Sequence, residues 1–93
     1  MNCFEREQQK LADYIDERDH ILAELEKSLL SYGFRQEGSL RCFYKGNIRV
    51  CLFHGSYGGC LTIKGNIRNH PRWRDGTIRM VNKAIRLAAE EAA

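Results

Sequence analysis

The sequence has almost no proline, the residue that most strongly interrupts a helix. It contains one proline, Pro71, in 93 residues, and neither proline nor glycine occurs between Glu5 and Ser31. That absence permits one long uninterrupted helix. No apolar run approaches the roughly 18 residues that a membrane helix needs, and the N-terminus lacks the apolar stretch of a signal peptide. We therefore expect a cytoplasmic protein with no membrane segment.

The four cysteines lack the close pairing that metal sites use. Structural zinc sites combine four ligands and favour Cys pairs separated by two to four residues. Here the spacing is nine residues from Cys42 to Cys51 and nine from Cys51 to Cys60. In a cytosolic chain such thiols stay reduced. We read them as small side chains that lie abreast on three neighbouring strands, and we predict no metal and no cofactor.

Charge is distributed unevenly along the chain, although the net charge is only +3. Residues 1–31 carry four basic and eight acidic residues, which gives 4 − 8 = −4. Residues 32–63 carry +3, residues 64–86 carry +6, and the tail returns −2. An acidic front and a basic back favour contact with a polyanion, oriented self-association or docking on another protein.

Residues 5–31 have the periodicity of an amphipathic helix. Its apolar positions are Leu11, Ile15, Leu22, Leu25 and Leu29. Arg18 occupies the same stripe where an apolar residue is expected. We therefore expect the N-terminal half of the helix to kink, to protrude or to pair with another chain. A homodimer through this helix would bury Leu11, Tyr14 and Ile15.

Short β-rich runs separated by glycine turns follow the helix. We predict an antiparallel meander of three or four strands over residues 34–64, a basic loop over 65–76 and a helix over 77–92. The fold class is α+β, a single two-layer domain over 1–93 with both helices on one face of the sheet. The pentapeptide Lys-Gly-Asn-Ile-Arg occurs at 45–49 and again at 64–68. The first copy reads as a hairpin turn, and the second is either another turn or a phosphate-binding loop.

A two-residue Gly46-Asn47 loop fixes the hairpin register and so sorts the side chains between the two faces of the sheet. One face collects the core residues Phe34, Phe43, Ile48, Val50, Leu52, Leu61 and Ile63. The other collects Leu40, Cys42, Tyr44, Arg49, Cys51, Phe53, Cys60, Thr62 and Lys64. This second face is open if both helices pack on the first, and exposed apolar patches mark binding surfaces.

Two groups of residues are candidate binding sites. Tyr44, Arg49, Phe53 and Lys64 on the open face suit stacked bases and phosphates, although a second copy or the first helix would cover the same patch equally well. The basic segment suits a polyanion, and its alternatives are a solvated face or pairing with the acidic first helix. It comprises Arg68, Arg72, Trp73, Arg74, Arg79, Lys83 and Arg86. We predict no catalytic residues, because nothing in the spacing of His20, His54 and His70 makes them converge.

Four short stretches resemble the small HicA-type toxins, whose double-stranded-RNA-binding-like fold runs helix, three strands, helix. They are Tyr32-Gly33-Phe34, Gly38-Ser39, Phe53-His54-Gly55 and Gly76-Thr77-Ile78-Arg79. In that family the Gly-Ser pair precedes a catalytic histidine, and here Leu40 stands in its place. The resemblance therefore implies the order of elements and an RNA-related role, without the ribonuclease activity.

The leading functional hypothesis is a small non-enzymatic binding module that acts on another macromolecule. A phage- or plasmid-type inhibitor of a nucleic-acid-processing enzyme has this size and charge pattern, and its partner would be a protein. The alternatives are direct RNA or DNA binding, and a HicA-like ribonuclease with an altered active site that uses His54.

Overall fold

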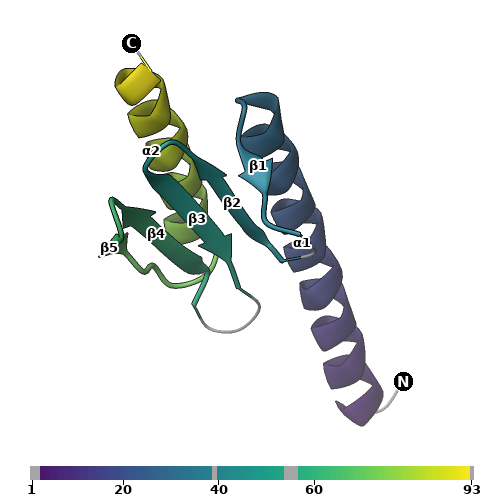
Figure 1. The fold of residues 1–93 in the computed structure, drawn as a ribbon. Coiled ribbons are helices and arrows are strands. Elements are labelled where there is room, and N and C mark those ends of the chain that lie inside the picture. The colour runs from purple at the N-terminus through teal and green to yellow at the C-terminus, as the bar shows by residue number, and fades with distance from the viewer. Residues whose placement is uncertain (1–2, 39, 54–56, 93) are drawn as a thin grey trace.

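The computed structural model describes residues 3–38, 40–53 and 57–92. Two helices flank five strands in chain order (Figure 1). The elements are α1 (Cys3–Ser31), β1 (Arg35–Gln36), β2 (Cys42–Lys45), β3 (Ile48–Leu52), β4 (Gly59–Ile63), β5 (Asn66–Asn69) and α2 (Asp75–Ala92). The predicted α+β class is therefore confirmed.

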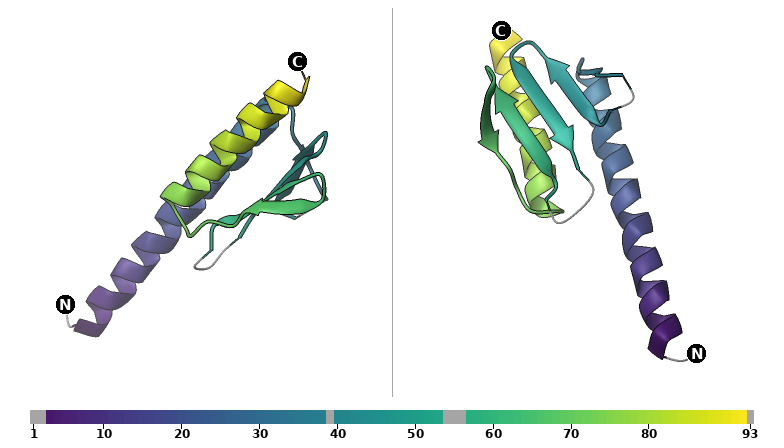
Figure 2. Two further views of the ribbon diagram at one scale, coloured as in Figure 1. Left: turned by 90° about the vertical axis from the view of Figure 1, so that its left-hand side faces the viewer. Right: turned by 60° about the horizontal axis from the view of Figure 1, so that its bottom comes forward.

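The strands form one antiparallel sheet in the order β1-β2-β3-β4-β5, so each strand pairs with its neighbour in sequence. Both helices lie side by side on one face of this sheet, and no helix or strand of the described residues covers the other face (Figure 2). Helix α2 packs against β3 and β4, while α1 packs against α2 and β1. The domain is thus the expected two-layer arrangement.

The core lies between the sheet and the helices. Phe43, Val50 and Leu61 from the sheet are fully buried against Leu22 and Leu29 of α1 and Met80 and Val81 of α2. Burying each such side chain stabilises the fold by roughly 1.5–3 kcal/mol. The sheet and both helices therefore depend on one another for their stability.

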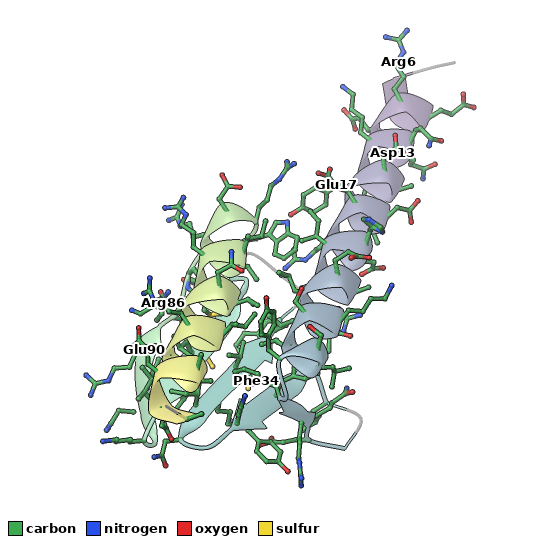
Figure 3. The ribbon with its side chains drawn as sticks, turned by 90° about the horizontal axis from the view of Figure 1, so that it is seen from above. Arg6, Asp13, Glu17, Phe34, Arg86 and Glu90 are labelled. Atoms are coloured by element: carbon green, nitrogen blue, oxygen red, sulfur yellow. The ribbon has the colours of Figure 1, made fainter. Side chains whose placement is uncertain are left out.

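The predicted hairpin register is confirmed. Cys42 pairs with Cys51, which pairs in turn with Cys60 on β4. The core-face residues of β2, β3 and β4 are accordingly buried or half-buried under the helices, with Phe34 beside them (Figure 3).

The sheet has one strand more than the three or four predicted. Residues 66–69 lie within the segment predicted to be a loop, but they form β5 at the edge of the sheet, beside β4. A two-residue turn at Lys64-Gly65, with both residues at positive φ, joins the two strands. The strand was missed because its side chains are polar and three of its four residues are exposed, so it lacks the alternation of a half-buried strand.

The first helix protrudes well beyond the body of the domain. Every residue from 5 to 17 is exposed, and the molecule measures 57 × 22 × 21 Å. Its radius of gyration is 15.2 Å, against about 12 Å for a compact chain of this length. We call residues 5–17 the arm (Figure 2).

Arg18 marks the point where the arm leaves the body, and the structure explains its place in an apolar stripe. Its guanidinium lies 4.3 Å from the centre of the Trp73 ring, and one nitrogen donates a hydrogen bond of 3.0 Å to the Phe53 carbonyl. The side chain is 7 % exposed. Beside it, Arg74 pairs with Glu17 at 2.9 Å. These contacts hold α1 to the segment ahead of α2 without kinking it.

Over the residues that the structure describes, neither helix has an apolar stretch that meets the requirements of a membrane span.

Candidate functional site

The outer face of the sheet contains a shallow depression at the end where the β2–β3 and β4–β5 turns meet. Its volume is about 630 Å³, and Tyr44, Arg49, Thr62 and Lys64 are among the residues that line it. The two turns are joined by a hydrogen bond of 3.0 Å from the Lys64 amide to the Asn47 carbonyl. Three of the four platform residues predicted from the sequence thus surround one depression.

Within this depression Arg49 is already paired with a carboxylate. Its guanidinium donates two hydrogen bonds to Glu37, at 3.0 and 2.8 Å. The hydrogen bonds from Arg49 hold the pKa of Glu37 below its ordinary value of 4.5, and Glu37 raises the pKa of Arg49 in return. Arg49 therefore adds no net positive charge to this face, which leaves Lys64 as a cation without a carboxylate partner among the described residues.

Phe53, the fourth platform residue, lies apart from the depression. Its ring meets His70 edge-on at 6.1 Å between centroids, and His70 stacks on Tyr57 at 4.7 Å. This aromatic group lies beyond the end of β3 opposite the Gly46-Asn47 turn. Tyr44 and Phe53 are thus separated along the sheet and do not form one continuous stacking platform.

The three central cysteines lie abreast across β2, β3 and β4, as expected. Burial and a hydrogen bond with Cys42 raise the pKa of the Cys51 thiol to about 12. At neutral pH this thiol is protonated and is neither a nucleophile nor a ready metal ligand. The described residues contain no group of three or more His, Cys, Asp or Glu residues placed to hold a metal ion.

Helix α2 carries the clearest concentration of positive charge. Its buried stripe includes Met80, Val81, Ala84 and Ala88. On the opposite side of the helix lie three exposed cations, which we call the basic ridge: Arg79, Lys83 and Arg86. Their steps of four and three residues place them in one row about 10 Å long. Arg86 points away from α1 into solvent (Figure 3).

The rest of the basic segment is divided among different surroundings. Arg68 is exposed on the edge strand β5, and Arg72 is exposed where its backbone bridges to Tyr57. Trp73 is half-buried under Arg18, and Arg74 pairs with Glu17. Trp73 and Arg74 therefore hold the arm to the body.

The two candidate surfaces lie on opposite sides of the domain. The basic ridge is on the outer side of the helical layer, whereas Tyr44, Arg49 and Lys64 are on the outer face of the sheet. The helical layer and the sheet therefore lie between the two surfaces. A ligand in contact with both would have to pass around the β5 edge.

Several contacts that shape these surfaces could not be found by sequence reasoning. Glu37 neutralises Arg49 from a neighbouring strand connection, and Glu91 at the end of α2 accepts a hydrogen bond of 3.1 Å from the Asn47 amide. Both join residues that are distant in sequence and carry no local signal. The only available hint was Arg18 in an apolar stripe, which indicated a buried cation with an unknown partner.

The structure describes some of the residues that carry the resemblance to HicA-type toxins. Leu40, which stands in the place of the family's catalytic histidine, is exposed. Ser39, His54 and Gly55 lie outside the described residues. The ribonuclease alternative therefore stays a prediction.

The chain matches no protein-family model, no curated protein and no solved structure.

Proposed function

We propose that the protein is a non-enzymatic binding module that holds nucleic acid through phosphate contacts along the basic ridge. The observation that carries the proposal is the state of Arg79, Lys83 and Arg86. All three are exposed on one face of α2, and none has a carboxylate within 4.0 Å among the described residues.

The alternative in which the acidic first helix neutralises the basic segment has little support. Two carboxylates in the body part of α1 pair elsewhere, Glu24 with Lys27 and Glu26 with Arg41. Among the ion pairs of the described residues, the one that joins the basic segment to an α1 carboxylate is Arg74 with Glu17. The ridge is therefore available to a ligand from outside the chain.

The chemistry of the ridge suits phosphate. Two of its three cations are arginines, whose planar guanidinium matches phosphate oxygens through paired hydrogen bonds. A row of fixed cations without anionic partners gains free energy by releasing the counterions that a nucleic acid carries.

A protein partner is the second candidate, as a phage- or plasmid-type inhibitor would require. It is supported by a different observation, the exposed apolar side chains on the acidic arm. A nucleic acid is repelled by that arm, so the two candidates use different surfaces and can be tested separately.

Fluorescence anisotropy with labelled single-stranded and duplex oligonucleotides tests the proposal. Three phosphate contacts give a duplex salt slope of about −2.7, or about 40-fold weaker binding between about 50 and 200 mM salt. Substituting Arg79→Ala and Arg86→Ala together should reduce the slope to about −0.9. The matched control, Arg6→Ala with Lys10→Ala, removes the same charge from the arm and should leave the slope unchanged. Equal losses in both pairs, or no binding at low salt, would contradict the proposal.

A further inference from the structure

We infer that the arm is a homodimerisation element, in which two copies pair antiparallel and the acidic tip of each arm lies on the basic end of the other body. This interface uses a surface separate from the basic ridge and does not depend on nucleic-acid binding.

The apolar stripe of the arm lies outside the core cluster, and no helix or strand of the described residues packs over it. Leu11, Tyr14 and Ile15 are 59 %, 48 % and 47 % exposed. Leu11 and Ile15 continue the stripe that packs into the core further along α1 at Leu22 and Leu25. An amphipathic helix buries such a face against a partner. The arm extends about 20 Å beyond the body, and the apolar stripe occupies about the inner 10 Å of it, from the junction at Arg18 out to Leu11.

Charge indicates that the partner is another copy of this chain. The arm contains five acidic and two basic residues, 2 − 5 = −3. The body from which it protrudes has exposed Arg72 and Arg74 at that end. Arg74 already binds a carboxylate of its own arm, Glu17, at 2.9 Å. The basic end therefore accepts arm carboxylates, and Arg72 has none among the described residues.

An antiparallel pair satisfies both features at once. With Leu11 of each copy against Ile15 of the other, the tip of each arm runs to the other body, and Glu7 comes level with the end that presents Arg72. A parallel pair would instead set the two acidic tips against each other and leave both basic ends without a partner. Docking of an arm along the basic ridge would leave the stripe uncovered, because α2 has no exposed large apolar side chain in the described residues.

Sedimentation velocity over a range of protein concentrations tests the pairing. At low salt the wild type should approach twice 10.8 kDa. Leu11→Glu with Ile15→Glu should sediment as a monomer throughout. Gln9→Glu with His20→Glu, which places two carboxylates on the opposite side of α1, should remain dimeric. Far-ultraviolet circular dichroism checks that both variants keep their helices. A monomeric wild type, or a dimer that survives the stripe substitutions, would overturn the inference.

A charge exchange tests the antiparallel arrangement and the identity of the partner. Glu7→Arg and Arg72→Glu should each raise the dimer dissociation constant about tenfold, because either substitution replaces the two symmetry-related exposed ion pairs of the dimer by two repulsions. The two together in one chain should restore dimerisation, because each copy then supplies both reversed charges. Failure of the double variant to recover would exclude this contact. The stripe variant should still bind oligonucleotide, so dimerisation and the proposed function can fail independently.

Discussion

Replacing Arg18 by methionine tests how the arm is joined to the body. Methionine keeps an unbranched stem that can pack against Trp73, but it removes the guanidinium and its hydrogen bond to the Phe53 carbonyl. The carbonyl then loses its hydrogen-bond donor and faces an apolar side chain at the buried position of Arg18.

The magnitude follows from two interactions. A hydrogen bond from a charged donor contributes roughly 1.5–3 kcal/mol, and a partly desolvated cation–π contact contributes about 1 kcal/mol. The stem retained by methionine and water entry beside the carbonyl offset part of this, so we expect a loss of about 2 kcal/mol in the free energy of unfolding. For a domain of this size that corresponds to a decrease of roughly 8–16 °C in Tm.

Thermal and urea unfolding followed by circular dichroism measure the loss. Arg6→Met is the matched control, because Arg6 is exposed on the arm and makes no contact with the body (Figure 3). It should change the free energy of unfolding by less than about 0.5 kcal/mol. If Arg18→Met changes the free energy of unfolding by as little as Arg6→Met does, the Arg18 guanidinium does not stabilise the junction between the arm and the body.

Three further predictions concern the sheet. Because the pKa of Glu37 in the folded protein lies below its ordinary value of 4.5, the Glu37–Arg49 ion pair stabilises the fold fully above pH 4.5, and this stabilisation is lost as the pH falls through the folded-state pKa. A carbon NMR titration of the Glu37 carboxyl should therefore give a midpoint below pH 4.5, and Arg49→Gln should raise that midpoint. Because burial and the hydrogen bond with Cys42 raise the pKa of the Cys51 thiol to about 12, native Cys51 should be alkylated at neutral pH more than about tenfold more slowly than in the urea-unfolded chain, as measured by peptide mass mapping. Gly58→Ala should lower the free energy of unfolding by more than about 2 kcal/mol, because the new Cβ would overlap the Thr77 hydroxyl. In the control Gly38→Ala the new Cβ meets open space, so urea unfolding should show only the backbone strain of a positive φ, about 1 kcal/mol.

The sheet register could be predicted because one short turn and one apolar pattern agree. A two-residue loop at Gly46-Asn47 places Phe43 opposite Val50, and both then face the helices. A slip by one residue would expose the whole apolar set. The alternation of side chains along β4 likewise places Leu61 and Ile63 on the face under the helices, as predicted.

The repeated pentapeptide shows where such local reasoning stops. In the first copy the turn is Gly46-Asn47 and Lys45 pairs with Ile48, but in the second the turn is Lys64-Gly65, one residue earlier. Ile48 is consequently buried at 2 % exposure, whereas Ile67, its counterpart in the second copy, is 68 % exposed on the outer face. Identical residues form different turns because the first copy lies over the core and the second lies at the sheet edge.

The sequence predicts which charged and aromatic residues lie on the surface, but it does not predict how they are placed relative to one another. A helix over residues 77–92 necessarily places Arg79, Lys83 and Arg86 on one face, and all three are exposed there. The neutralisation of Arg49 by Glu37 and the separation of Phe53 from Tyr44 depend on contacts between distant segments. No spacing in the sequence encodes these contacts.

The most direct test of the central claim is amide NMR of the labelled protein during titration with an oligonucleotide at low salt. We predict that the largest shift changes occur in α2 between Arg79 and Arg86, while the amides of Tyr44 and Thr62 on the outer sheet face stay in place. Changes confined to the sheet face, or no changes at all, would contradict a phosphate-binding role for the basic ridge.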